Sequence, residues 1–240
     1  MKRQRLRKTV NNWTVMKLNP CSDWPEERVK AALPSQTRIS DFLRLQHIPP
    51  HDRLWVALHT LFLTERMARL FCANVAALTL RRIDRANSLD GERSLDRRLF
   101  LGIERARAFA RSPGSKQAQK NIELSFRECE YIWNHDFYTT HECDAGSMVA
   151  SLCGREERDS MPYTFQGWEP YPVLDTAAEV IGEIAYNKKY SKEINGTRHR
   201  SDLYWKAGDR ATDAQEAARK REFERQCRVL ANLVEKASKK

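Results

Sequence analysis

The sequence predicts an all-α protein of about eight to nine helices, with one long loop rich in aromatic residues and proline. Three observations support this fold class. Apolar residues recur at intervals of three and four along most of the chain. Residue types that begin and end helices separate these periodic segments. Before residue 154, no alternating apolar run is followed by the turn that a β-hairpin requires.

The N-terminal part predicts short helices only. Residues 9–20 show no sustained period, and we expect them to be irregular. A short helix follows, because Asp23 can cap it, Pro25 suits its first turn, and the apolar pattern ends near Leu33. Ser35 is expected to cap the next helical segment.

Residues 50–83 are densely helical, and Thr64 offers an N-cap where one helix ends and a longer one begins. Small residues occupy more than one face of the longer helix, so we expect neighbouring helices to approach it closely. These residues are Ala68, Cys72, Ala73, Ala76 and Ala77. Residues 84–94 are polar and predict a loop, after which Ser94 is expected to cap a further helix.

Two helices are expected in the middle of the chain after that one. Pro113 and Gly114 end the preceding helix, and Ser115 begins a long helix that stops near residues 134–136. A shorter helix follows over 142–153. The connections between these helices are short, so neighbouring helices should pack nearly antiparallel.

Residues 154–173 predict the long loop, because they contain three prolines and no sustained period. The aromatic residues of this loop are the candidate contacts to a partner protein, since interfaces select exposed aromatic side chains. They are Tyr163, Phe165, Trp168 and Tyr171. A strap that folds back onto the helices is an equally good interpretation, and one short hairpin is a third.

Helical periodicity returns over residues 174–240, interrupted by an Asn-Gly turn. Asp213 and Glu216 have the spacing of a capping box, which predicts that the last helix begins there. We therefore expect a basic tail over residues 1–20, followed by a single helical domain over 21–240.

The charge is concentrated at the two ends of the chain. The whole chain has a net charge of +10. Residues 1–8 have a net charge of +5 and residues 219–240 also have a net charge of +5, so the intervening body is neutral. Basic ends attract any polyanion, which makes nucleic-acid binding the alternative function. The candidate residues for it are Lys2, Arg3, Arg5, Arg7, Lys8, Arg219, Lys220 and Arg221.

The six cysteines have irregular spacings, which favours buried, reduced thiols over a disulfide framework. One group of possible zinc ligands falls within residues 129–153. It consists of Cys129, His135, His141, Cys143 and Cys153. Zinc sites generally use two close pairs of ligands, and this spacing is missing. We expect no metal and no cofactor, although the spacing alone does not settle whether this group binds one.

No enzyme motif is visible. The sequence has no strand–turn–helix serine motif and no glycine-rich phosphate loop among its nine glycines. An enzyme would need residues gathered from separate segments, for example His135, Asp136, His141 and Asp144 converging on a deep pocket. We expect a protein that is not an enzyme.

The composition is that of a globular protein. Of the 240 residues, 41 % are hydrophobic and 31 % are charged, which excludes a fibrous chain and a wholly disordered one. No stretch comes near the roughly 18 apolar residues of a membrane-spanning helix. Asn11, Asn12 and Lys17 interrupt the place where a secretion signal would need its apolar part. We expect a cytoplasmic protein without membrane contact.

The helical segments that contain Arg69, Phe71, Cys72 and Ala73, and Ala106 to Arg111, resemble the immunity-protein domain of bacterial polymorphic toxin systems, which is all-helical. The resemblance lies in residues 52–58, 68–76 and 98–111, with a weaker likeness in 223–230. The most specific features are Arg69, Phe71, Cys72 and Ala73 in one helix and Ala106, Arg107, Ala108, Phe109, Ala110 and Arg111 in a later one. The resemblance covers about residues 50–135 and 214–237, and it implies an immunity-like core over about residues 50–153.

This resemblance implies a cytoplasmic, non-enzymatic protein that binds a toxin domain and blocks it. The chain departs from the family in its additional N-terminal helices, its aromatic loop and its few alanines over 116–136. Its neutral body also suits a nuclease target poorly, because immunity proteins against nucleases are usually acidic. The alternatives are an inhibitor of a host defence nucleoprotein, phage- or plasmid-encoded and similar to anti-CRISPR proteins, or a nucleic-acid-binding accessory protein.

Overall fold

The computed structural model describes residues 7–33, 35–59, 62–135, 140–154, 170–194 and 201–238. In these ranges the chain forms ten helices and one two-stranded sheet, so the all-α prediction is confirmed. None of the described helices has both the length and the apolar character needed to cross a membrane.

The N-terminal part is a small unit built of short elements. They are β1 (Thr9–Val10), α1 (Asn12–Met16), α2 (Glu26–Ala32), β2 (Thr37–Arg38), α3 (Ile39–Phe42) and α4 (Pro50–Ala57). β1 and β2 pair antiparallel, with Thr9 opposite Arg38 and Val10 opposite Thr37. The pairing brings the start of the chain next to α3.

The prediction of irregular structure over residues 9–20 is wrong. Asn11 caps α1 through a capping box with Thr14, and both Val10 and Val15 are buried. A cap of two side chains stabilises a helix too short to show an apolar period. The caps expected at Asp23 and Ser35 are also wrong, because α2 follows Pro25 and α3 follows Arg38, neither with a side-chain cap.

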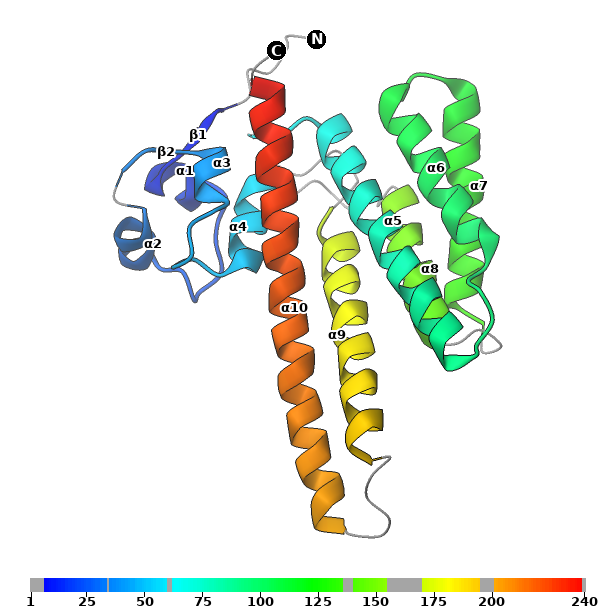
Figure 1. Cartoon of the computed structure of the whole chain (residues 1–240). Coiled ribbons are helices and arrows are strands. Elements are labelled where there is room, and N and C mark those ends of the chain that lie inside the picture. Colours follow the sequence, from blue (N-terminus) through cyan, green and yellow to red (C-terminus); the bar gives the residue numbers. More distant parts are fainter. Residues whose placement is uncertain are drawn as a thin grey trace.

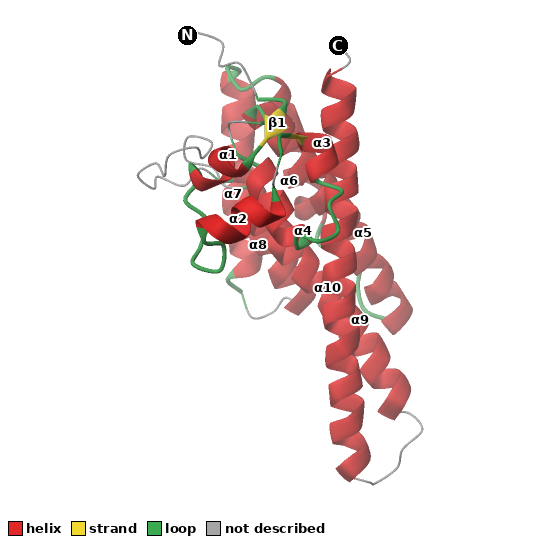
Figure 2. Ribbon diagram, turned by 90° about the vertical axis from the view of Figure 1, so that its left-hand side faces the viewer, coloured by secondary structure: helices red, strands yellow, loops and turns green. Residues whose placement is uncertain are grey.

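Six longer helices form the rest of the molecule. They are α5 (Glu65–Asp90), α6 (Arg97–Arg111), α7 (Lys116–Trp133), α8 (Thr140–Cys153), α9 (Tyr171–Ile194) and α10 (Ser201–Ser238). Consecutive helices alternate in direction, as the short connections predicted (Figure 1). α9 and α10 form a long antiparallel pair that extends beyond the other helices at one end (Figure 1 and Figure 2).

The pair formed by α9 and α10 separates two groups of elements. The N-terminal unit packs against α10 through α3 and α4, whereas α5 and α8 pack against α9 (Figure 1). α6 and α7 complete the second group by packing against α5, α8 and each other. Thr64, Ser115 and Gly154 begin or end their helices where the sequence predicts.

The loop predicted over residues 84–94 is largely helix. α5 continues to Asp90 and ends at Gly91, whose φ of 75° lies in the left-handed region that glycine tolerates. Asn87 is buried in this last part of α5, and its side chain donates to the carbonyl of Arg93. Asp96 rather than Ser94 then caps α6.

The start predicted for the last helix at Asp213 is also wrong. α10 runs without interruption from Ser201 to Ser238, and Asp213 and Glu216 lie within it. Ala211 and Ala218 are buried on either side of these residues, so burial continues across the apparent cap. A capping-box spacing inside a helix is simply a pair of neighbouring polar side chains.

Close helix packing is confirmed where small residues predicted it. Ala68, Cys72, Ala73 and Ala76 on α5 are all fully buried. Glycine serves the same purpose on α6, because a Cβ added at Gly102 would lie 2.6 Å from Val149 Cγ1 of α8. The cysteines are free thiols, four of them buried, but Cys21 is exposed.

Candidate functional site

The aromatic residues predicted to contact a partner cannot be placed. Tyr163, Phe165 and Trp168 lie outside the described residues. Tyr171 is the first residue of α9, and its side chain is not described either. Pro170, directly before it, is buried, and its carbonyl accepts from Cys72 Sγ at 3.7 Å. This contact fixes the point at which the predicted loop returns to the helices.

Of the basic residues predicted near the N-terminus, the two described ones precede β1, which lies at the end of the molecule where α10 ends (Figure 1). Lys2, Arg3 and Arg5 lie outside the described residues, whereas Arg7 and Lys8 are exposed beside β1. Arg7 lies over the Trp13 ring, 5.2 Å from its centroid. Arg44, which follows α3, pairs with Glu235 of α10 and so holds these two regions together.

The other predicted basic residues do not join that surface. Arg219, Lys220 and Arg221 lie on α10 about 22 to 26 Å along the helix axis from Lys236, since each helical residue rises 1.5 Å. Arg219 pairs with Glu179 of α9 at 3.5 Å, and the other two are exposed. The basic residues of the two ends therefore form at least two separate surfaces.

A different positive surface lies on α5 and α6. We call it the arginine surface, and it consists of Leu78, Arg81, Arg107 and Arg111. Arg81 and Arg111 are exposed, and Leu78, one turn before Arg81, is 40 % exposed. Arg107 donates from Nη2 to Asn74 Oδ1 at 2.9 Å, which holds its guanidinium across the contact between the two helices.

The electrostatics of the arginine surface are unfavourable. Burial lowers the pKa of Arg107, and the positive charges of Arg111 and Arg81 lower it further, while Glu104 acts in the opposite direction. Among the residues that the structure describes, Arg81, Arg107 and Arg111 form no ion pair with a carboxylate. Three like charges thus stand together. Glu104 partly offsets them at Arg107, but no carboxylate among the described residues forms an ion pair with them.

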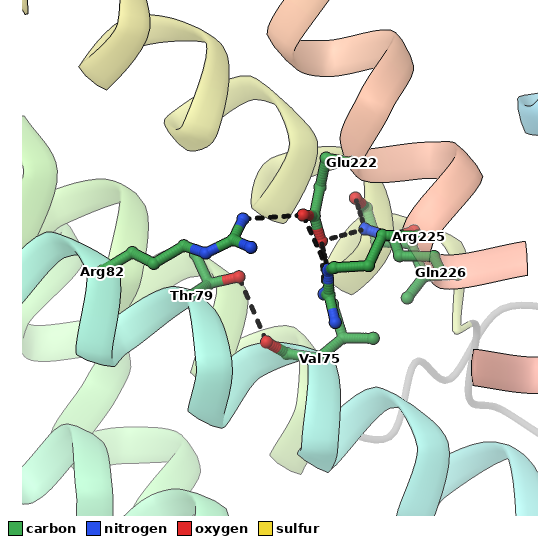
Figure 3. A network of polar contacts seen from close by, with 7 residues as sticks. Val75, Thr79, Arg82, Glu222, Arg225 and Gln226 are labelled. Carbon is green, nitrogen blue, oxygen red and sulfur yellow. Dashed lines mark hydrogen bonds and ion pairs between the residues drawn. The ribbon is translucent and has the colours of Figure 1, made fainter. Parts of the chain in front are cut away.

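Other arginines form buried or half-buried ion pairs between helices. Glu222 of α10 is only 1 % exposed and accepts from Arg82 Nη1 at 2.8 Å, across the contact with α5 (Figure 3). Arg225 Nε, at 2.9 Å, and Gln226 Nε2, at 3.3 Å, also donate to this carboxylate. The network gives the buried charge three donors, as burial of a carboxylate requires.

Arg53 and Arg69 are two further buried arginines whose contacts join helices. Arg53 of α4 is completely buried; it donates to the carbonyl of Leu43 at 2.7 Å and pairs with Glu224 of α10. Arg69 of α5 pairs with Glu65 at 2.7 Å and donates to the carbonyl of Leu152 at 3.1 Å. These contacts join α4 to α10 and α5 to α8, so their role is structural.

One group of side chains could hold a metal ion. His141 and Asp144 lie three residues apart at the start of α8, and Glu183 faces them from α9. One ligand atom from each lies within 4.8 Å of the others. Burial raises the pKa of both Asp144 and Glu183, and in Glu183 the nearby Asp144 raises it further.

The predicted group of cysteines and histidines does not gather. Cys153 Sγ donates to the carbonyl of Gly102, and Cys143 Sγ donates to that of Ile132. His135 instead stacks on Tyr131, with ring centroids 3.6 Å apart. Burial raises the pKa of the Cys129 thiol to about 12, which disfavours the thiolate that zinc needs. Of the predicted group only His141 reaches other possible ligands.

Sequence reasoning missed Glu183 and the arginine surface. Glu183 is 39 residues from Asp144, and its pairing with α8 depends on how α9 packs. The arginines belong to a body whose net charge is zero, so a count of charges along the chain hides them. The Ala-Arg alternation of residues 106–111 was the one available signal for Arg107 and Arg111.

No protein-family model, no curated protein and no solved structure matches this chain.

Proposed function

We propose that this chain is a non-enzymatic binding protein that neutralises a partner protein, as inhibitors of the immunity type do, and that the arginine surface receives an acidic face of that partner. The observation that carries the proposal is the group formed by Arg81, Arg107 and Arg111 without a carboxylate partner among the described residues. A partner that supplies carboxylates would relieve their repulsion and form charge-assisted hydrogen bonds.

The apolar side chains of α5 favour a protein partner over a nucleic acid. Leu78 is 40 % exposed beside Arg81, and Leu89, further along the same helix, is 78 % exposed. Arginine next to exposed apolar residues is typical of the centres of protein interfaces. Nucleic-acid surfaces instead surround their arginines and lysines with polar groups that follow a phosphate backbone.

The family resemblance supports the same proposal. The segments that resemble the immunity-protein domain lie mostly in α5 and α6, and Arg107 and Arg111 belong to its most specific motif. The arginine surface also accounts for the mismatch with nuclease targets, because it suits an acidic partner rather than a cationic cleft.

The test is capture and measurement of the partner with matched variants. The tagged chain is purified from the cell that encodes it, the bound protein is identified, and its affinity is measured with purified components. We expect the double variant Arg81→Glu and Arg111→Glu to lose about tenfold or more in affinity. The control carries the same charge change elsewhere, at the exposed Arg97 and Arg127, and keeps its affinity.

Two outcomes would contradict the proposal. The first is equal affinity of the purified partner for the two double variants. The second is a nucleic acid as the bound molecule, with affinity that falls steeply as salt rises. Replacement of Arg7 and Lys8 by glutamine would then abolish binding, which supports the basic ends as the functional surface.

A further inference from the structure

The group of His141, Asp144 and Glu183 brings together the donor atoms of a cation site. The imidazole and the carboxyl of Asp144 come from one turn of α8, so the helix itself sets their spacing. Glu183 lies on α9, which packs against α8 along its length. His141 Nδ1 and Glu183 Oε2 are 3.7 Å apart. Two donors bound to one ion at about 2.0–2.2 Å each would be separated by a similar distance.

The neighbour of the imidazole nitrogen in this group is the Glu183 carboxylate, with which it forms an ion pair only when the imidazole is protonated. His141 Nδ1 is buried from solvent and makes no hydrogen bond. The 3.7 Å to the Glu183 carboxylate is too long for one. The nitrogen therefore faces the Glu183 carboxylate, with Asp144 one turn along α8, in the arrangement that a metal-ligating imidazole and two carboxylates would adopt.

The charges around the nitrogen favour a cation as the ligand of this group. Asp144 and Glu183 lie close enough to share a hydrogen bond, and each is partly removed from solvent. An anion would be repelled there by the two carboxylates. A cation would satisfy both carboxylates and the nitrogen lone pair together.

We propose that His141, Asp144 and Glu183 bind one divalent transition-metal ion, which links the first turn of α8 to the middle of α9. One imidazole and two carboxylates suit Zn²⁺ or Mn²⁺, and three protein ligands leave room for water in the remaining coordination positions. This site is separate from the arginine surface and does not depend on the proposed partner.

The experiment titrates the full chain with Zn²⁺ near neutral pH and measures heat and the midpoint of thermal unfolding. We expect one ion per chain and a higher unfolding midpoint when it is bound, because the ligands come together only in the folded state. Glu183→Gln and His141→Ala should each reduce the affinity by about tenfold or more. Asp144→Asn, which keeps the shape of the side chain, is measured as well in case His141→Ala unfolds.

Two controls make the result specific. Glu179→Gln removes a carboxylate one turn before Glu183, where it pairs with Arg219, and should leave the Zn²⁺ affinity unchanged. Cys21→Ser removes the one exposed thiol among the described cysteines and should also leave it unchanged. Equal Zn²⁺ affinity in the wild type and Glu183→Gln would overturn the proposal. Loss of the binding in Cys21→Ser would overturn it too.

Discussion

Arg81 and Arg82 are neighbours on α5, yet they serve different regions of the molecule. Arg82 reaches Glu222 of α10 and belongs to a network of buried charge (Figure 3). Arg81 faces Arg107 of α6 and has no carboxylate partner among the described residues. The difference teaches that neighbouring arginines can differ in role: Arg82 joins two helices, whereas Arg81 belongs to the surface that we propose binds another molecule.

The largest effect is expected from breaking the paired region. Glu222→Ala removes a carboxylate that is 1 % exposed and leaves the donors of Arg82, Arg225 and Gln226 without it. We expect the free energy of unfolding to fall by about 3 kcal/mol, because unsatisfied buried donors are costly. Urea unfolding measures this change.

The exposed Glu216 on the same helix provides the matched control. Glu216→Ala removes the same group at a position open to solvent, and its effect should stay within about 0.5 kcal/mol. If the two variants were equally stable, the contacts of Glu222 between α5 and α10 would not contribute to the free energy of unfolding. The contrast between Arg82 and Arg81 would then be wrong.

The second prediction separates binding from stability. Arg81→Glu with Arg111→Glu should weaken partner binding by about tenfold or more, while the free energy of unfolding stays within about 0.5 kcal/mol of the wild type. Arg82→Ala should do the reverse, because its partner Glu222 lies inside the protein. Affinity by calorimetry and stability by urea unfolding must be measured on both variants. A double variant that loses stability as well would show that the arginine surface is structural.

Asp144 of α8 and Glu183 of α9 bring two carboxyl groups together, as the arginine surface brings positive charges together. Burial raises the pKa of Glu183 above its ordinary value of 4.5. Between pH 4.5 and this higher pKa, the folded chain keeps a proton on Glu183 that the unfolded chain has lost. This contribution to stability is present below 4.5 and is lost as the pH rises through the folded pKa.

Glu183→Gln cannot ionise and escapes this loss. We compare the free energies of unfolding of the variant and the wild type by urea unfolding, in the presence of a chelator. The difference in favour of the variant should be larger at about pH 7.5 than at about pH 4. Addition of Zn²⁺ should cancel this advantage by stabilising only the wild type. If the stability difference did not change with pH, the pKa of Glu183 would be the same in the folded chain and in the unfolded chain, which would contradict this prediction.

Local signals in the sequence predicted the fold class and several helix ends. Thr64 and Ser115 each satisfy a backbone N–H of the helix that follows, and this chemistry is readable without tertiary structure. The polar residues at the end of α5 predict a loop, but they form helix. Asn87 is buried there and donates to the carbonyl of Arg93, and this contact forms only after folding. The continuity of α10 was missed for the same reason.

The candidate sites were less predictable than the fold, because residues distant in the chain build them. Arg81 and Arg107 are 26 residues apart and meet only because α5 and α6 pack side by side. His141 was recognised as a possible ligand, but with cysteines that turn to backbone carbonyls instead. Spacing along a helix can be read from the sequence, whereas the pairing of one helix face with another cannot.

The smallest effect tests whether the arginine surface is strained in the free protein. Arg111→Ala removes one of the like charges that lower the pKa of Arg107, so we expect the free energy of unfolding to rise slightly at low salt, by less than about 0.5 kcal/mol. The gain should disappear in high salt, because screening removes repulsion between exposed charges. Arg127→Ala, at an exposed position on α7, should give no such salt-dependent gain. If Arg111→Ala were destabilising at low salt, this arginine would contribute a favourable contact, and the repulsion that favours an acidic partner would be absent.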